Sequence, residues 1–565
     1  MDRRTFLKNS FFMGILIFPG EKLPQELKIS EAQVKDLFTV KSTNTARSSI
    51  FPQSVASGEP QMQGITLWTR IGSPQPGLIQ AGFQISRDID FQAIALQGVS
   101  QTDASQDYTL KAVVNSPHLQ PSTTYYYRFI YQGTASRTGR FQTLPAVNSE
   151  VKQVRFAYIS CQDYTNGYYN AHRFLAEEEI DFVVFLGDYI YESVGDKSFQ
   201  RGIRPLQLPS NQQVAATLED YRFLYQTYNS DPNLQKLRER FAFINIWDDH
   251  EFAGDCFGTN TPDQVPFHKS NLRQWATQAW IEHIPTSIIF QPEQGPLAAV
   301  QIYRSFKFGN LLELVMTDER LYRDGPPCDK LEEQQQYLQQ NRYMIPDCPE
   351  RNYPHRTMLG TTQRQWFLDK VLNSAATWKI WGNEVMTMQL KYLSTFATEL
   401  LGESTPDLFV SFDQWDGYPV ERALLFRTLK EAGVKNFVTI TGDFHTFATG
   451  YQKINFDDPH EQPIGVELLV GSMASSNFAE TNHSSSQRLK PVIEVMTQML
   501  TASNPHIQYF NSTTHGYNVV EVTPEALTCT LKAVSDITTS RATLSTLKVF
   551  RVPLDQVLIE DLTPA

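Results

Sequence analysis

The sequence predicts a large α/β domain, with central β-sheets flanked by helices, preceded by a small all-β sandwich of the immunoglobulin or fibronectin kind. Between residues 47 and 146, short β-branched and aromatic runs alternate with clusters of Gly, Pro, Ser and Asp, which is typical of a sandwich. From residue 150 onward, short apolar runs alternate with helical patterns, which is typical of strands buried between helices. Of the 565 residues, 41% are hydrophobic and 19% charged, enough apolar material for packed cores.

Residues 1–30 are typical of an export signal. Arg3 and Arg4 precede Phe6-Leu7-Lys8, and a short apolar run extends from Phe11 to Phe18. This pattern predicts a twin-arginine signal, and therefore a periplasmic or extracellular protein that meets the twin-arginine export machinery. The run is far shorter than the roughly 18 residues of a membrane-spanning helix, so we expect no transmembrane helix. An uncleaved anchor and an ordinary basic N-terminus are the alternatives.

The region up to residue 146 divides into a linker and the predicted sandwich. Residues 31–46 are polar and lack sustained periodicity, which predicts the linker. Within the sandwich, three runs have strand character, at residues 64–70, 82–86 and 124–131. We interpret the tyrosines of the last run as core and edge residues of the sandwich rather than as a carbohydrate-binding face, because aromatic residues are ordinary strand formers.

The α/β domain is predicted at residues 150–537, followed by a C-terminal segment at 538–565. Its strands are expected at 154–160, 181–186, 242–247, 311–317, 378–381, 437–441 and 466–470. Two helices are expected at 362–373 and 421–432, and Gly433 stands where a helix typically ends.

The charge balance and the cysteine count exclude two classes of protein. Acidic residues outnumber basic ones by 61 to 49, so the chain offers no overall basic surface and we expect no nucleic-acid partner. Five cysteines are too few for a disulfide scaffold of this length. Cys328 and Cys348 either form a disulfide after export or stay free thiols, since spacing along the chain gives no distance.

Ligand-type side chains follow four of the predicted strands. Cys161 follows the first strand, and Asp188 and Tyr191 follow the second. The run Asp248-Asp249-His250-Glu251 follows the third, and Gly442-Asp443-Phe444-His445 follows the sixth. Because ligands bind outside the carboxyl ends of strands in open α/β sheets, these four loops can converge. Thiolate, carboxylate, phenol and imidazole form a set of metal ligands, and so many like charges in one place require cations.

Each of these residues has a simpler structural explanation when it is taken alone. A Gly-Asp pair after a strand usually forms a turn, and a single cysteine is usually a buried apolar residue. The recurrence of ligand-type residues at four strand ends favours a shared site, because functional residues gather on such loops.

The combined motifs resemble those of a known family. Gly187-Asp188, Asp248-Asp249-His250-Glu251 and Gly442-Asp443-Phe444-His445 are similar to the metal-binding motifs of calcineurin-like metallophosphatases. Cys161, in place of the opening Asp-x-His, and the added Tyr191 resemble the alkaline phosphatase D (PhoD) family. Two further runs resemble the same family, at residues 54–60 and 415–419. The likeness covers residues 50–530 and implies a catalytic domain of the metallophosphatase type.

The resemblance also implies a set of metal ions and ligands. Ferric iron would be held by Cys161, Asp188, Tyr191 and His445, and calcium nearby by Asp188, Asp249 and Asp443. The residue types agree, because a thiolate and a phenolate favour a trivalent ion whereas carboxylates suit calcium. Asp249 stands where the wider superfamily has asparagine, which leaves the identity of the second metal open.

The implied activity is hydrolysis of small organic phosphate esters by a metal-activated water, as in an exported alkaline phosphatase or phosphodiesterase. Asp188 and His250 are the expected catalytic residues, with His250 protonating the departing oxygen or steadying the phosphate. Alternatively, His250 is a supporting histidine held by Asp248 or Glu251. Arg320 follows the fourth strand and is a candidate phosphate ligand, although most arginines are simply solvated.

Other functions are weighed against this one. A phospholipid- or nucleotide-specific phosphodiesterase of the same fold and a non-catalytic, metal-containing secreted binding protein are the alternatives. A serine hydrolase is disfavoured because residues 471–475 lack the Gly-x-Ser-x-Gly spacing. A metalloprotease is disfavoured because His460-Glu461 lacks the second histidine of His-Glu-x-x-His.

Overall fold

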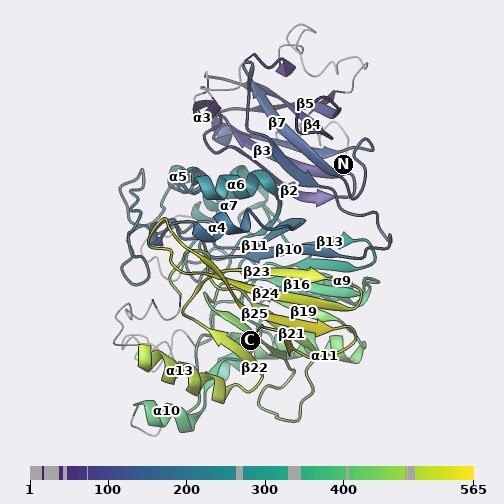
Figure 1. The fold of residues 1–565 in the computed structure, drawn as a ribbon. Helices are drawn as coiled ribbons and strands as arrows, with labels where there is room; N and C mark the ends of the chain where they lie inside the picture. The colour runs from purple at the N-terminus through teal and green to yellow at the C-terminus, as the bar shows by residue number, and fades with distance from the viewer. Residues whose placement is uncertain are drawn as a thin grey trace.

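The computed structural model describes residues 15–17, 37–41, 47–72, 74, 76–261, 271–328, 345–401, 406–477, 480 and 490–564. Over these residues, two large sheets lie at the centre, with a six-stranded sheet at the N-terminal end and a small three-stranded sheet (Figure 1). The predicted signal at residues 1–30 lies outside the described ranges, apart from β1 (Ile15–Ile17). A search of the described residues for a helix able to cross a membrane finds none.

The largest sheet has ten strands and contains the first three predicted strands of the α/β domain. Its order is β26 (Glu560–Asp561), β25 (Leu544–Pro553), β24 (Ala526–Val534), β23 (His515–Val522), β10 (Val154–Ile159), β11 (Phe182–Leu186), β12 (Ala242–Ile246), β2 (Val55–Gln61), β3 (Gly64–Arg70) and β6 (Thr109–Asn115). The strands β10, β11 and β12 run parallel, with Phe182 opposite both Phe156 and Ala242. Their carboxyl ends therefore lie at one edge of the sheet.

The second large sheet has seven strands and contains the other four predicted strands. Its order is β13 (Arg304–Phe308), β14 (Leu312–Met316), β16 (Trp378–Asn383), β19 (Phe437–Thr441), β21 (Gly465–Leu469), β20 (Phe447–Gln452) and β22 (Ile507–Asn511). The strands β14, β16, β19 and β21 are parallel neighbours. All seven strands predicted for the α/β domain are thus confirmed, divided between two sheets.

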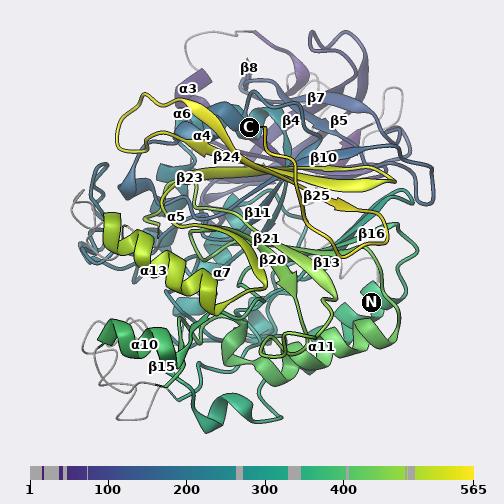
Figure 2. The ribbon, with the colours of Figure 1, turned by 60° about the horizontal axis from the view of Figure 1, so that its bottom comes forward.

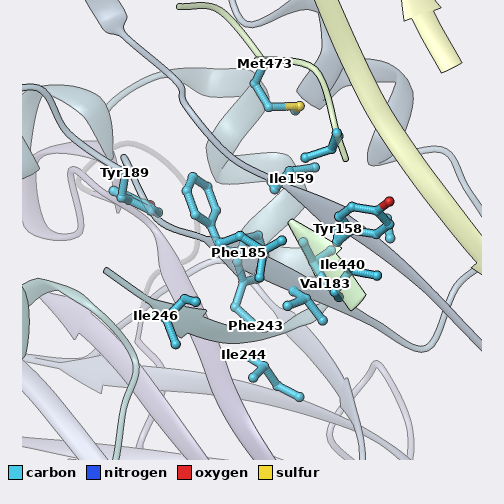
Figure 3. Close-up of a cluster of buried hydrophobic side chains, with 14 of the residues drawn as sticks. Tyr158, Ile159, Val183, Phe185, Tyr189, Phe243, Ile244, Ile246, Ile440 and Met473 are labelled. Atoms are coloured by element: carbon cyan, nitrogen blue, oxygen red, sulfur yellow. The ribbon is translucent and has the colours of Figure 1, made fainter. Parts of the chain in front are cut away.

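The two large sheets share one apolar core. Figure 3 shows part of it, where Tyr158, Val183 and Ile244 of the ten-stranded sheet meet Ile440 of the seven-stranded sheet. All four side chains are fully buried. Burying an apolar side chain of this size contributes roughly 1.5–3 kcal/mol. This core holds the strand ends of both sheets in fixed positions.

Helices cover the outer faces of both sheets. Four helices pack into the core beside the ten-stranded sheet: α4 (Asn170–Leu175), α5 (Leu218–Tyr228), α6 (Pro232–Arg240) and α7 (Leu272–His283). The seven-stranded sheet packs against α9 (Gly360–Leu372) and α11 (Pro419–Glu431), which confirm the two predicted helices. Within the described residues, three more helices are named, α3 (Arg47–Ile50), α10 (Ser394–Leu401) and α13 (Lys490–Ser503). Figure 2 shows α11 beside the seven-stranded sheet, with α10 and α13 near each other elsewhere.

The N-terminal region departs from the predicted self-contained sandwich. The strands β2, β3 and β6 extend the ten-stranded sheet, because β2 pairs in parallel with β12 through Ser57 opposite Ala242. The six-stranded sheet comprises β1, β5 (Ile94–Thr102), β4 (Ile79–Ser86), β7 (Thr124–Tyr131), β8 (Thr134–Ala135) and β9 (Gly139–Gln142). It shares a core with β2, β3 and β6 that includes Tyr125 and Tyr127, so the prediction of core tyrosines is confirmed for both. An immunoglobulin- or fibronectin-like sandwich is not confirmed.

Two further features concern the later part of the chain. Cys328 and Cys348 form a disulfide, the first of the two predicted alternatives. The nearby small sheet has the order β15 (Ile345–Pro346), β18 (Leu408–Phe409) and β17 (Lys391–Tyr392).

The C-terminal segment at 538–565 contains β25 and β26, and β25 pairs with β24 from Ala526 to Val534. This segment is therefore part of the ten-stranded sheet.

Candidate metal centre

Loops from both large sheets bring the predicted iron ligands together. Cys161 follows β10, Asp188 and Tyr191 follow β11, and His445 follows β19. Ligand atoms of Cys161, Asp188 and His445 all lie within 4.8 Å of one another. The hydroxyl of Tyr191 donates to Asp188 Oδ2 at 2.9 Å and lies 3.1 Å from His445 Nε2. The four side chains therefore surround a common point between the sheets.

The backbone turns sharply at these strand ends. Cys161, Asp188, Asp443 and His445 have φ angles of 58°, 59°, 54° and 49°. Left-handed backbone is uncommon for residues other than glycine, and such strain gathers at functional sites.

The surroundings of Gly187 explain why a glycine precedes Asp188 in the motif. Its φ angle is 93°, and a Cβ at this position would lie 2.3 Å from the Cβ of Asp248. A larger residue would push apart the loops that follow β11 and β12. Glycine here permits the close approach that brings Asp188 beside Asp248 and Asp249.

Two further groups of ligand-type residues adjoin the first. Ligand atoms of Asp188, Asp249 and His250 lie within 4.8 Å of one another, as do those of Asp248, Asp249 and Asp443. Asp188 therefore belongs to two groups, in the position expected of a bridging ligand. Among the described residues, Asp248 Oδ2 and Asp249 Oδ1 are buried without a hydrogen-bond partner. Buried carboxylate oxygens of this kind are donors that suit a cation.

Arg320 is fully buried among carboxylates. Its Nη1 lies 2.7 Å from Asp413, its Nη2 lies 2.7 Å from Asp443, and its Nε contacts Asp248. Burial alone would lower the pKa of Arg320, but these carboxylates outweigh it and raise the pKa well above the usual value. Because each nitrogen already contacts a carboxylate, Arg320 is a counter-ion of the cluster and not the free phosphate ligand considered from sequence.

His250 is held by a residue that the sequence analysis did not assign. Its Nδ1 lies 2.7 Å from Glu192 Oε2, and not beside Asp248 or Glu251, the partners named for the alternative role of a supporting histidine. Glu251 instead accepts hydrogen bonds from the backbone N–H groups of Asp188, Tyr189 and Asp248. It thereby ties the loops after β11 and β12 together.

Burial and charge set the protonation of His250. Burial opposes a charged imidazole, but Glu192, Asp249 and Asp188 outweigh this effect and raise the pKa of His250 well above 6.5. The side chain keeps 18% of its surface exposed. The neighbouring carboxylates therefore favour the protonated form of His250, and its exposed surface lies within reach of a molecule that binds at the cluster.

The protonation of the ligands suits metal binding. Burial is the main cause, and the negative charge of Asp188 the second, that raises the pKa of both the Cys161 thiol and the Tyr191 phenol well above their usual values. Burial lowers the pKa of His445 to about 4, so its imidazole is neutral near pH 7. The Nδ1 atom of His445 lies 2.5 Å from the carbonyl oxygen of Ser476 and donates to it, so Nε2 faces the cluster as an acceptor. The donor set thus fits a cation that displaces the protons of the thiol and the phenol.

The structure brings all six predicted metal ligands and His250 into one region, and it adds residues that sequence reasoning missed. Glu192, Asp413 and Ser476 contact His250, Arg320 and His445 respectively. Glu192 directly follows Tyr191, and Asp413 lies two residues before the run at 415–419, so both adjoin motifs visible in the sequence. No such signal marks Ser476.

Comparisons with known proteins identify the family. A family model described as PhoD-like phosphatase matches residues 156–531. The chain belongs to the PhoD-like phosphatase family. A second model, described as PhoD-like phosphatase, N-terminal domain, matches residues 38–145. Membership in the PhoD-like phosphatases makes the protein a phosphoric ester hydrolase.

Individual PhoD-like relatives match over nearly the whole chain. The chain is 30% identical to alkaline phosphatase D of Bacillus subtilis (strain 168) over 566 residues, which cover 98% of this chain and 89% of the relative. A solved structure of PhoD matches with a TM-score of 0.79 and 28% identity, covering 93% of this chain and 94% of the other. The fold described above is therefore that of PhoD.

Proposed function

We propose that this protein is an exported, metal-dependent alkaline phosphatase or phosphodiesterase that hydrolyses organic phosphate esters with water. The observation that carries the proposal is the convergence of Cys161, Asp188, Tyr191 and His445 from both sheets. A thiol, a carboxylate, a phenol and an imidazole around one point form a metal-binding set. Family membership supplies the reaction class, and this donor set supports the dependence on metal.

The ligands divide by the ions that their atoms prefer. Cys161, Asp188, Tyr191 and His445 would hold ferric iron, because a thiolate and a phenolate favour a trivalent ion. Asp188, Asp249 and Asp443 would hold calcium, which prefers carboxylate oxygens. When bound, these cations would offset the charge of the phosphate and lower the pKa of a water molecule from about 15.7 toward neutrality.

The chain's own residues orient the reaction. Asp188 joins the two groups of ligands, because its Oδ2 accepts from Tyr191 while its Oδ1 accepts from the backbone N–H of His250 at 3.4 Å. His250 uses Nδ1 to contact Glu192, so Nε2 is the ring nitrogen that can give a proton to the departing oxygen. General acid catalysis of this kind contributes about 10²- to 10⁴-fold.

Export by the twin-arginine machinery to the periplasm or the extracellular space is part of the same proposal. It rests on Arg3 and Arg4 ahead of the short apolar run in residues 1–30. The disulfide between Cys328 and Cys348 supports it, because disulfides persist in oxidising compartments.

The bridging position of Asp188 offers the test. Turnover of a chromogenic phosphate monoester and a matched diester is measured for the wild type, for Asp188→Asn and for Asp90→Asn, an exposed aspartate of the N-terminal region. Asp188→Asn should lower kcat/KM by at least about 10³-fold for whichever ester is hydrolysed, with loss of bound metal, because it removes a shared ligand. Asp90→Asn should behave as the wild type. Full activity in Asp188→Asn contradicts the proposed site.

A further inference from the structure

An aromatic ring that the proposed chemistry does not use lies beside the candidate metal centre. Phe199 belongs to the loop between β11 and α5, and its side chain is half-buried. The centroid of its ring lies 5.7 Å from that of His250 and 6.1 Å from that of Tyr191. The rings of His250 and Tyr191 are themselves 4.1 Å apart. Phe199 therefore extends an aromatic surface outward from the group that we assign as the proton donor.

The loop that carries Phe199 is held in a defined conformation. The buried side chain of the next residue, Gln200, accepts hydrogen bonds from the backbone N–H groups of Gly195 and Asp196 at 2.6 and 2.9 Å. Its amide nitrogen donates to Asp163 and to the carbonyl of Ser193, both at 2.9 Å. Four bonds from one buried side chain close the loop on itself and anchor it to the protein.

A second anchor connects Phe199 to the metal ligands. The hydroxyl of Ser476 donates to the carbonyl oxygen of Phe199, and the carbonyl oxygen of Ser476 accepts from His445 Nδ1. The residue that orients His445 thus also positions the loop of Phe199. The backbone of Phe199 is therefore anchored, and its ring lies beside the rings of His250 and Tyr191.

We propose that Phe199 is a specificity-determining residue that contacts the leaving group and favours esters of aromatic alcohols. The inference rests on the proposed function, because it takes Nε2 of His250 as the atom that faces the departing oxygen. A leaving alcohol placed there lies next to Phe199. Aromatic pairs gain about 0.5–1.5 kcal/mol beyond the burial of their area, so an aromatic alcohol is bound better than a small aliphatic one.

Non-hydrolysable phosphonates test the inference without the effect of leaving-group acidity on rate. Phenylphosphonate and methylphosphonate are compared as competitive inhibitors of the metal-loaded enzyme. The wild type should bind phenylphosphonate about tenfold more tightly than methylphosphonate. Phe199→Ala should reduce this ratio to about two, and Phe199→Tyr should preserve it. Phe290→Ala, which removes a half-buried ring from another loop of the same domain, should leave the ratio unchanged.

The outcomes separate a failure of the inference from a failure of the proposed function. If Phe199→Ala keeps the wild-type ratio, or weakens both phosphonates equally, Phe199 only supports His250 and the inference is wrong. A wild type that hydrolyses esters but shows no preference between the phosphonates also overturns it and leaves the proposed function intact. A wild type that neither hydrolyses esters nor binds either phosphonate contradicts both. The melting temperature of each variant, measured in parallel, identifies a loss of binding that comes from unfolding.

Discussion

The carboxylate of Glu192 lies 2.7 Å from Nδ1 of His250, and its other oxygen accepts a hydrogen bond from the backbone N–H of Gly254 at 2.9 Å. A carboxylate held at both oxygens has little freedom to turn. It therefore fixes the plane of the His250 ring. Because Nδ1 is held by Glu192, Nε2 is the ring nitrogen left to face a bound ester. Glu192 is in this sense a positioning residue for the proposed proton donor.

Glu192→Gln should lower kcat by about 10- to 100-fold, because the amide removes the charge that holds His250 protonated and oriented. KM should change little, since Glu192 does not belong to the phosphate-binding groups. The loss should be greater for esters of weakly acidic alcohols, which need protonation on leaving, than for 4-nitrophenyl esters. Steady-state kinetics on a series of leaving groups measures this, with the exposed Glu525→Gln as the control. An equal loss for all leaving groups would show that Glu192 acts only on stability.

Cys161→Ala should remove iron while largely preserving calcium, because Cys161 belongs to the proposed iron group and not to the proposed calcium group. The iron content should fall by about tenfold or more, and the visible absorption of a phenolate bound to ferric iron should disappear. Cys529→Ala supplies a matched control, since Cys529 is also a buried free cysteine but lies in β24. Elemental analysis and a visible spectrum measure the result. A colourless wild type without iron would refute the assignment of the ion.

Gly187→Ala should disrupt the site, because the new Cβ would lie 2.3 Å from the Cβ of Asp248 in a backbone of positive φ. The expected loss is about 3 kcal/mol of stability or more, together with loss of bound metal. Gly433 has a similar positive φ, but a Cβ there has no atom within 4 Å. Gly433→Ala should therefore cost only about 1 kcal/mol and retain the metal. Denaturant unfolding and metal analysis compare the two variants, and equal behaviour would contradict the close approach.

Arg320→Met should lower the free energy of unfolding by about 3–5 kcal/mol, because it leaves the buried Asp248 and the half-buried Asp443 without their counter-ion, while Asp413 keeps its ion pair with Arg323. Added calcium should recover part of this loss by neutralising the same carboxylates. Arg137→Met is the control, since Arg137 is 52% exposed and its contact with Glu239 is 3.3 Å long. Its removal should change stability by no more than about 1 kcal/mol. Thermal unfolding with and without calcium distinguishes the two, and an undiminished stability of Arg320→Met would contradict the role of counter-ion.

The local pattern of the sequence was enough to predict every parallel strand that leads to the site. Buried strands are continuous apolar runs, and the residues that follow them are visible as abrupt polar motifs, so Cys161, Asp188 and His445 could be placed at strand ends. The approach of Cys161 and Asp188 also follows, because their parallel strands present their carboxyl ends at one edge, whereas His445 comes from the other sheet and meets them only through the packing of the two sheets. The identity of the ligands then suggested the chemistry.

Contacts between residues far apart in the sequence could be seen only in the tertiary structure. The pairing of β2 with β12 merges the predicted sandwich into the ten-stranded sheet, and nothing in either strand specifies its neighbour. Glu192 meets His250 across 58 residues, and Arg320 meets Asp413 across 93. A sequence motif records the conformation that a short segment prefers, whereas these contacts depend on how two sheets pack over a shared core. Local sequence patterns therefore specify the strands and the ligand types, whereas packing sets which charges meet and how the proposed proton donor is held.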